Sequence, residues 1–197
     1  MTNRFIWFGA GTVVGAVLLY LLLWTGGVLS PYLAQVRAHL PPAAEVAPAA
    51  NAEVKMVSPI QGLKASDIRD SFKEGRPGGH PHEATDIMEP RGTPVHAMVD
   101  GTIRKLFVSK AGGLTIYEFD QTATYCYYYA HLHGYAEGIA EGQHVSRGTV
   151  IGYVGSTGNA SANAPHLHLG IDRIGPEKHW WGGTPVDPYP ILLKLLK

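Results

Sequence analysis

Cysteine is almost absent from this chain of 197 residues, because Cys126 is the only one. A single cysteine excludes a disulfide within the chain and a metal site built from several thiolates. An excess of positive charge is also absent, since 16 lysines and arginines balance 16 aspartates and glutamates. Nucleic-acid binding calls for a basic surface, so we expect no nucleic acid partner. Any zinc-type metal site must then use histidine and carboxylate ligands.

Charged residues are missing from Phe5 to Leu29, where valine, leucine and aromatic residues dominate. This run exceeds the roughly 20 residues that cross a bilayer, and it also exceeds the apolar core of about 7–15 residues in a signal peptide. We therefore expect an uncleaved transmembrane anchor at 5–29. Arg4 precedes the run, and the next cation is Arg37. The positive-inside rule then favours residues 1–4 in the cytoplasm and export of the rest of the chain.

The remainder of the chain shows no long helical periodicity. Residues 30–57 are rich in alanine and proline, and we expect them to form an extended stalk. In residues 58–197, short β-type runs alternate with turns, in keeping with the 24 glycines and 14 prolines of the chain. This pattern predicts a mostly β domain, a small antiparallel β-sandwich or partial barrel. The expected strands are 93–99 and 102–106, paired as a hairpin, and then 114–119, 125–131, 148–154 and 166–171.

Histidines gather in three separate segments of this domain. His166 and His168 lie two positions apart on an expected strand, so their side chains face the same side. His82 and Asp86 form a second pair of metal-ligand type, and His131 follows a run of tyrosines. Three clusters of the same chemistry in a short domain indicate one common site rather than scattered surface histidines.

His82, Asp86 and His168 supply two nitrogens and one carboxylate oxygen, which leaves the fourth position of a tetrahedral ion open. This is the ligand set of a catalytic Zn²⁺, which lowers the pKa of a bound water to about 7 and polarises a carbonyl group. We expect one Zn²⁺ per domain. His131 and His166 remain as catalytic side chains, of which one or both can orient the water, accept its proton or hydrogen-bond the developing oxyanion. Such a site suits hydrolysis of an amide bond without a covalent intermediate.

An alternative interpretation treats residues 82–86, His-Glu-Ala-Thr-Asp, as a helical motif. It is similar to the His-Glu-x-x-His of zincins, with Glu83 as the general base. Pro81 directly precedes the motif, Pro90 follows closely, and a third ligand on a helix is missing. The strand interpretation is therefore favoured.

Three segments together resemble the lysostaphin-type, LytM-like zinc metallopeptidase family. They are, in the family's order, HEATDIMEPRGTPVHAMVDGTIRKL (82–106), YAHL (129–132) and EGQHVSRGTVIGYVGSTGNASANAPHLHLGI (141–171). The resemblance implies a small antiparallel β fold with a substrate groove. It implies Zn²⁺ ligation by His82, Asp86 and His168, and it implies that His131 and His166 are the catalytic pair.

The resemblance further implies an endopeptidase that cuts peptide cross-links of bacterial peptidoglycan. Its expected partners are the stem and cross-bridge peptides of the wall, and the cytoplasmic membrane through residues 5–29. Two alternatives stay open: a non-cleaving or autoinhibited regulator of other wall hydrolases, and a zinc protease that acts on another envelope peptide. None of the five site positions is lost, which favours the enzyme. No segment of the sequence identifies an activator protein.

Several other residues have a structural and a functional interpretation. Trp180 and Trp181 lie in a loop rich in glycine and proline, where they form either a stacking platform or, as we favour, a packed lid. The polar stretch 67–79, which precedes the first ligand, is a candidate gating loop. Three tyrosines share the strand parity of His131 and either line the groove or pack in the core: Tyr125, Tyr127 and Tyr129.

Overall fold

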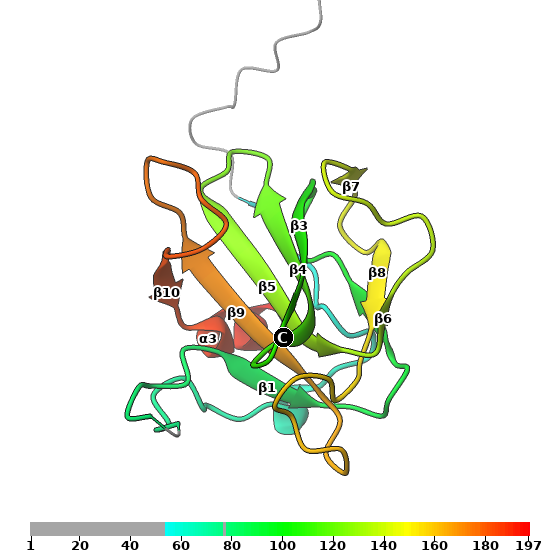
Figure 1. Cartoon of the computed structure of the whole chain (residues 1–197), viewed down its shortest axis with the longest axis vertical. Helices are drawn as coiled ribbons and strands as arrows, with labels where there is room; N and C mark the ends of the chain where they lie inside the picture. The colour runs from blue at the N-terminus through cyan, green and yellow to red at the C-terminus, as the bar shows by residue number, and fades with distance from the viewer. Residues whose placement is uncertain (1–53, 77) are drawn as a thin grey trace, which may run out of the picture. The chain divides into compact units, whose positions relative to one another are not determined.

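Antiparallel strand pairing over long sequence distances builds the main sheet of the protein (Figure 1). The computed structural model describes residues 54–76 and 78–197. The main sheet has the strand order β1-β9-β5-β4-β3-β7, and β10 pairs with β9 as well. Its strands are β1 (Thr85–Met88), β3 (Gly101–Ser109), β4 (Gly113–Asp120), β5 (Tyr125–Leu132), β7 (His144–Val145), β9 (His166–Arg173) and β10 (Thr184–Val186).

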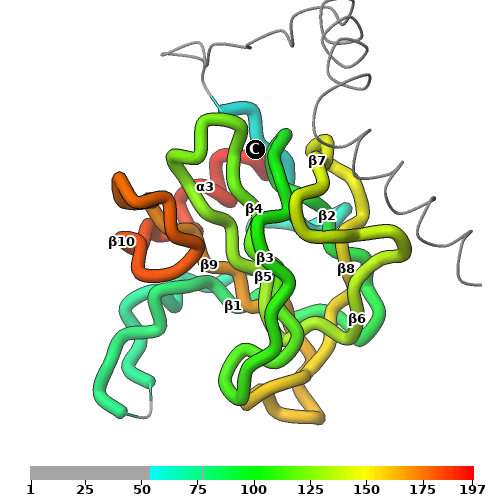
Figure 2. Tube along the Cα trace, turned by 45° about the horizontal axis from the view of Figure 1, so that its top comes forward, coloured from blue at the N-terminus to red at the C-terminus, as the bar shows by residue number. Residues whose placement is uncertain are grey.

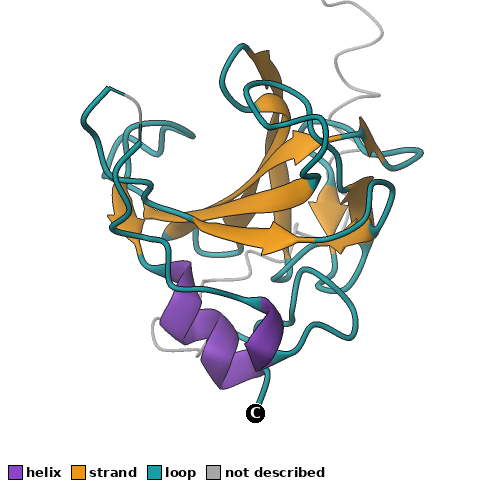
Figure 3. Ribbon diagram, turned by 90° about the horizontal axis from the view of Figure 1, so that it is seen from below, coloured by secondary structure: helices purple, strands orange, loops and turns teal. Residues whose placement is uncertain are grey.

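A second, smaller sheet completes the fold, in the strand order β2-β8-β6. Its strands are β2 (Pro94–His96), β6 (Gly134–Tyr135) and β8 (Val150–Tyr153). Among the described residues, two helical segments accompany the sheets, the 3-10 turn η1 (Ala65–Asp67) and helix α3 (Pro188–Leu195). Figure 3 shows α3 on one side of the main sheet, whereas long loops rise on the other side. The loop side is the side of the functional site described below.

The alternation of side chains along β9 shows how the sequence separates core from site. Leu167, Leu169 and Ile171 are fully buried. His166 and His168, which alternate with these residues along the strand, point to the opposite face. Each fully buried aliphatic side chain contributes about 1.5–3 kcal/mol. The same core continues through Ile87 of β1 and into the small sheet. Burial of this face therefore fixes the register that presents the two histidines on the other.

The expected mostly β, antiparallel class is confirmed for the domain, because the described residues form antiparallel sheets with little helix. The expected hairpin between 93–99 and 102–106 is wrong. Residues 94–96 pair with β8 of the small sheet, whereas residues 101–109 pair with β4 and β7 of the main sheet. Residues 97–99 are buried between them, so the chain crosses from one sheet to the other instead of turning back.

Helix α3 was not expected from the sequence, although its start carries a recognisable signal. Asp187 is the N-cap residue and accepts a hydrogen bond from the backbone N–H of Tyr189, and Pro188 occupies the first helical position. Leu192 on this helix is fully buried in the core. The eight-residue helix thus closes the end of the domain against β9.

The expectations for the N-terminal part concern residues outside the described range. They are the cytoplasmic segment 1–4, the anchor 5–29 and most of the stalk 30–57. Within residues 54–76 and 78–197, no helix combines the length and the apolar character that a membrane span requires.

Candidate metal centre

The pairing of β1 with β9 brings the first ligand pair and the His-x-His segment together. In this antiparallel register, Asp86 lies opposite His168 and Met88 lies opposite His166. Residues that face each other in such a pair have their Cβ atoms about 4.5–5.5 Å apart. The side chains of His166 and His168 share one face of β9, as the sequence predicts, and Asp86 is on the same face.

Three candidate ligand atoms converge on one point of this face. His82 Nε2 and His168 Nδ1 each lie 3.0 Å from Asp86 Oδ1, and they lie 3.0 Å from each other. A tetrahedral Zn²⁺ with bonds of about 2.0–2.1 Å separates its ligand atoms by about 3.3 Å. These three residues are also the one group of potential metal ligands among the described residues. Donor chemistry and spacing therefore fit a zinc ion.

The first ligand is held by the backbone that precedes β1. His82 N–H donates to the carbonyl of Glu74, and Glu83 N–H donates to the carbonyl of Phe72. The buried His82 ring directs Nδ1 to Ser71, with 3.2 Å to both the carbonyl oxygen and Oγ. A proton on Nδ1 satisfies that carbonyl and leaves the Nε2 lone pair for a metal.

The helical alternative for residues 82–86 is wrong. Glu83 has a positive φ of 57°, and strand β1 begins only two residues later, at Thr85. The Glu83 side chain is exposed. Burial raises the pKa of Asp172, and the negative charge of Glu83 raises it further. Glu83 is also absent from the residues that line the cavity above the candidate ligands, so it does not occupy the place of a zincin-like general base.

His131 and His166 flank the ligand cluster, and each directs one ring nitrogen to a backbone carbonyl. His131 Nδ1 lies 2.8 Å from the carbonyl of Thr157, and His166 Nδ1 lies 2.8 Å from the carbonyl of Ala164. Carbonyl oxygens only accept, so each neutral ring carries its proton on Nδ1 and keeps a lone pair on Nε2. The two rings are 4.9 Å apart, and the His131 ring is 5.4 Å from that of His168.

The electrostatics of the cluster favour a carboxylate among neutral imidazoles. Burial alone raises the pKa of Asp86, but the close polar contacts with His168, His82 and Arg76 outweigh it and hold this pKa well below its usual range. Burial, followed by the nearby His168, lowers the pKa of His131 to about 4. Burial also lowers the pKa of His168. Neutral imidazoles are the form that binds metal or accepts a proton.

A cavity of about 540 Å³ opens above these residues. Its walls come from the stretch before β1, the turn between β3 and β4, strand β5 and the loop before β9. The lining residues include Arg76, His80, Gly112, Tyr128, His131, Asn159, Ser161, Ala164, His166 and His168. The cavity is large enough for part of a peptide, and the candidate ligands His82 and His168 are among its lining residues.

Comparison with known proteins agrees with this geometry. Residues 80–188 match the model of Peptidase family M23, which is more than half of the chain. The chain belongs to peptidase family M23. The resemblance inferred from the sequence is thereby confirmed, and the matched segment contains all five predicted site residues.

The proteins to which this M23 chain is similar include several peptidases. It is 40% identical over 116 residues to an L-Ala–D-Glu endopeptidase of Bacillus subtilis (strain 168), which covers 56% of this chain and 34% of that protein. The chain thus spans about a third of the length of that curated relative. The catalytic domain of lysostaphin from Staphylococcus simulans has a TM-score of 0.54 and 30% identity, covering 64% of this chain and 90% of that one. A zinc-containing peptidase from Vibrio cholerae has a TM-score of 0.50 and 26% identity, covering 60% and 36%.

The tyrosines of β5 divide between the core and the cavity of this M23 domain. Tyr127 and Tyr129 are fully buried, as the core interpretation from the sequence has it, whereas Tyr128 lines the cavity, with its ring 5.8 Å from that of His168. The cause is His131, whose φ of 60° and the accompanying register shift against β4 interrupt the alternation of the strand. Strand parity from His131 therefore did not identify Tyr128 as the tyrosine of the cavity.

Arg76 is a further site residue that sequence reasoning missed. One of its guanidinium nitrogens lies 2.6 Å from Asp86 Oδ2, while Oδ1 of that carboxylate faces the two candidate histidine ligands. Arg76 belongs to the stretch 67–79 that we considered as a gate. The only sequence signal was a cation in a Gly/Pro-rich segment ahead of the first ligand. Arg76 fixes which carboxylate oxygen is presented to a metal.

Proposed function

We propose that this protein is a zinc-dependent endopeptidase that hydrolyses peptide cross-links of bacterial peptidoglycan. The observation that carries the proposal is the convergence of His82, Asp86 and His168 beside two imidazoles that present free Nε2 atoms. The Bacillus relative is an L-Ala–D-Glu endopeptidase, and a bond to a D-amino acid supports the substrate class. The zinc in the Vibrio peptidase supports the choice of metal.

The ligand residues would hold one Zn²⁺ through His82 Nε2, His168 Nδ1 and Asp86 Oδ1. When bound, zinc supplies a Lewis acid for the scissile carbonyl and lowers the pKa of a coordinated water to about 7. Ser71 fixes the His82 tautomer, and Arg76 neutralises the second oxygen of Asp86. These partners keep the donor atoms oriented before substrate arrives.

His131 and His166 would move the protons of the reaction. Each holds its own proton at Nδ1 against a backbone carbonyl, so each can accept the proton of the attacking water at Nε2. The resulting imidazolium can donate that proton to the leaving amine, and an Nε2–H group can stabilise the developing oxyanion. Burial keeps the pKa of His131 near 4, so this ring begins the reaction as a neutral acceptor.

We also propose that the enzyme acts outside the cytoplasm, tethered to the cytoplasmic membrane. The uncharged run 5–29 and the Ala/Pro-rich stretch 30–57 support an anchor and a stalk ahead of the peptidase domain at 58–197. A tether would confine hydrolysis to the wall that lies within reach of the membrane.

The test is a digest of purified peptidoglycan with the zinc-loaded full chain, beside the same chain with His166→Ala. We expect the unmutated protein to release new muropeptides, with a chelator blocking the release and His166→Ala abolishing it. Mass analysis of the products would identify the bond that is cut. Absence of products from a folded, zinc-bound protein would contradict the proposal and favour a regulatory role.

A further inference from the structure

A row of aromatic rings leads away from the candidate metal ligands along the loop side of the main sheet. The Tyr128 ring lies 5.8 Å from the His168 ring and 4.7 Å from the Tyr117 ring, which in turn lies 4.7 Å from Trp180. Tyr117 and Tyr128 are direct cross-strand partners of β4 and β5, so their side chains share one face of the sheet. The row is therefore built on rigid strands.

The row widens where the segment between β9 and β10 lies against the sheet. This segment, orange to red in Figure 2, carries Trp180 and Trp181, whose rings are 5.0 Å apart at an angle of 74°. Phe107 of β3 lies 5.3 Å from Trp180. We call Phe107, Tyr117, Tyr128, Trp180 and Trp181 the aromatic platform. Trp180 contacts Phe107 of β3 and Tyr117 of β4, so the loop and the sheet form one surface.

The platform is open to solvent at its far end. Trp181 is 55% exposed and Phe107 is 39% exposed, and they are two of the four large hydrophobic residues exposed among residues 54–76 and 78–197. Exposed aromatic rings that form a continuous row are candidates for an interaction site. Trp180 packs on the sheet, as a lid would, whereas the exposed Trp181 does not fit the packed lid that the sequence favoured.

We propose that the aromatic platform binds the glycan strand of the substrate, with N-acetylhexosamine rings stacked on its aromatic faces. The inference rests on the proposed function, because it places the sugar beside the peptide that reaches the metal centre. Hexose rings present flat C–H faces, which are weakly positive and complement the negative face of an aromatic ring. The sugar therefore needs no charged partner on the platform.

Continuity with the candidate metal centre selects this occupant. Tyr128 belongs both to the platform and to the cavity above the ligands. An extended peptide covers about 3.3 Å per residue, so the three ring-to-ring steps from His168 to Trp180 span at most about five residues. The proposal therefore requires that the sugar lies within about five residues of the peptide bond held at the metal. One substrate molecule can thus occupy both surfaces.

Tryptophan fluorescence tests binding directly. In the full chain with Trp7→Phe and Trp24→Phe, the remaining tryptophans are Trp180 and Trp181. We expect peptide-free glycan strands of alternating N-acetylglucosamine and N-acetylmuramic acid to produce a saturable change in emission. No change up to millimolar sugar would overturn the proposal. An equal change with phosphatidylglycerol vesicles but none with glycan would also overturn it and assign the surface to lipid.

Cleavage of two matched substrates tests the role of the platform in catalysis. They are cross-linked muropeptide dimers that carry their sugars and the same peptide dimers with the sugars removed. We expect Trp180→Ala and Trp181→Ala to reduce the apparent affinity for the sugar-bearing dimer about three- to tenfold, as for loss of one aromatic contact. The peptide dimer should be cut at an unchanged rate, and Trp180→Phe should restore much of the loss.

The matched control is Val108→Ala, which removes a side chain that is 65% exposed on the strand of Phe107. This variant should behave like the unmutated protein on both substrates. An equal loss on both substrates in the tryptophan variants would overturn the proposal, because it would mean that the platform only supports the site. If the unmutated protein cuts neither substrate, the proposed function fails, while the fluorescence titration still decides whether the platform binds glycan.

Discussion

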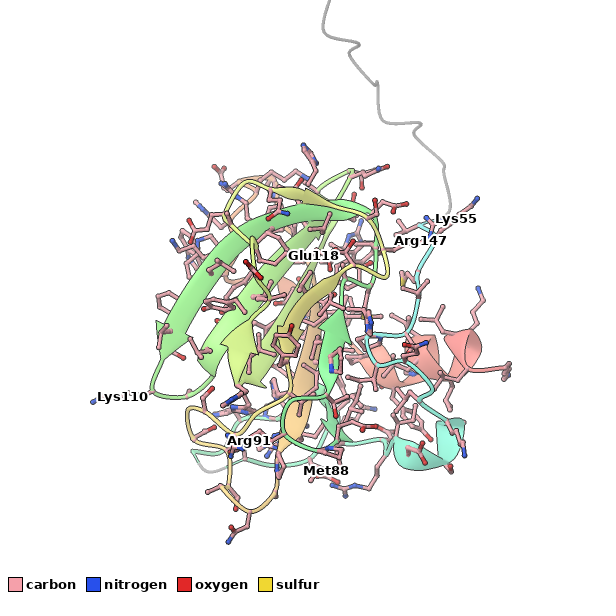
Figure 4. All side chains as sticks on the ribbon, turned by 90° about the vertical axis from the view of Figure 1, so that its right-hand side faces the viewer. Lys55, Met88, Arg91, Lys110, Glu118 and Arg147 are labelled. Atoms are coloured by element: carbon pink, nitrogen blue, oxygen red, sulfur yellow. The ribbon has the colours of Figure 1, made fainter. Side chains whose placement is uncertain are left out.

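The buried carboxyl of Glu118 makes a quantitative prediction about stability and pH. Glu118 lies in β4 with no exposed surface, and Figure 4 labels it in the interior of the domain. Its Oε2 accepts hydrogen bonds from the Tyr129 hydroxyl at 2.5 Å and from the Met98 N–H at 3.3 Å. Within the described part of the chain, Oε1 has no hydrogen-bond partner. Burial outweighs these hydrogen bonds and raises the pKa of Glu118 to about 7.

The sign and size of the effect follow from proton linkage. The folded protein holds the Glu118 proton up to about pH 7, whereas the unfolded chain releases it near 4.5. Stability from this group is fully present below pH 4.5 and is lost as the pH rises through 7. One pKa unit corresponds to about 1.4 kcal/mol, so the full loss is about 3 kcal/mol, of which about 2–3 kcal/mol falls between pH 5 and pH 8.

The perturbation is Glu118→Gln, which keeps the shape and stays neutral at every pH. Urea unfolding of both proteins at each pH from 5 to 8 gives the difference in free energy of unfolding. This difference cancels the other titrating groups, including His131, whose lowered pKa acts in the opposite direction. We expect the variant to gain about 2–3 kcal/mol on the unmutated protein between pH 5 and pH 8, on top of a constant offset from the new amide group.

Glu141→Gln is the matched control. Glu141 is exposed, and its hydrogen bond with Lys105 lowers its pKa, so it titrates below the tested range. The difference between this variant and the unmutated protein should not change from pH 5 to pH 8. A pH-independent difference for Glu118→Gln would refute the reasoning, because it would show that Glu118 does not titrate in this range when buried.

Three further substitutions test the site and its supports. Gly155→Ala should cost about 1–3 kcal/mol in urea unfolding and abolish cleavage, because its Cβ would lie 2.7 Å from the carbonyl oxygen of His131; unchanged cleavage would contradict this packing. Arg76→Gln should weaken zinc affinity at least about tenfold in a chelator competition, since it removes the partner of Asp86 Oδ2; unchanged affinity would assign Arg76 no role in ligation. Asp187→Ala should cost about 1 kcal/mol through loss of the α3 N-cap while leaving cleavage intact; a loss of cleavage would mean that α3 supports the site.

The sequence predicted those parts of the molecule that depend on local alternation and residue chemistry. His166 and His168 share a face because they lie on a regular strand, and Asp86 joins them because β1 pairs with that strand. The His-x-His spacing and the chemistry of the side chains predicted that His82, Asp86 and His168 belong to one site, and the structure brings these side chains together. Their role as metal ligands stays a prediction. The start of helix α3 also carries a local signal in the sequence, since Asp187 is an N-cap residue and Pro188 occupies the first helical position.

Features that depend on a local irregularity or on distant packing were not predicted. The left-handed backbone at His131 shifts the parity of β5, so Tyr128 faces the cavity in place of its neighbours. The contact between Arg76 and Asp86 depends on how the stretch before β1 folds back, which no periodic pattern encodes. The crossing of residues 97–99 between the sheets depends in the same way on the pairing partners of β2 and β3.

The most direct test of the central claim is the zinc content and cleavage activity of five single alanine variants, measured on the same preparations of the full chain. His82→Ala, Asp86→Ala and His168→Ala should lose both bound zinc and cleavage of peptidoglycan. His131→Ala and His166→Ala should keep one zinc per chain and lose cleavage, because they are expected to move protons and not to hold the metal. Full zinc retention by His168→Ala, or full activity of His166→Ala, would contradict the account.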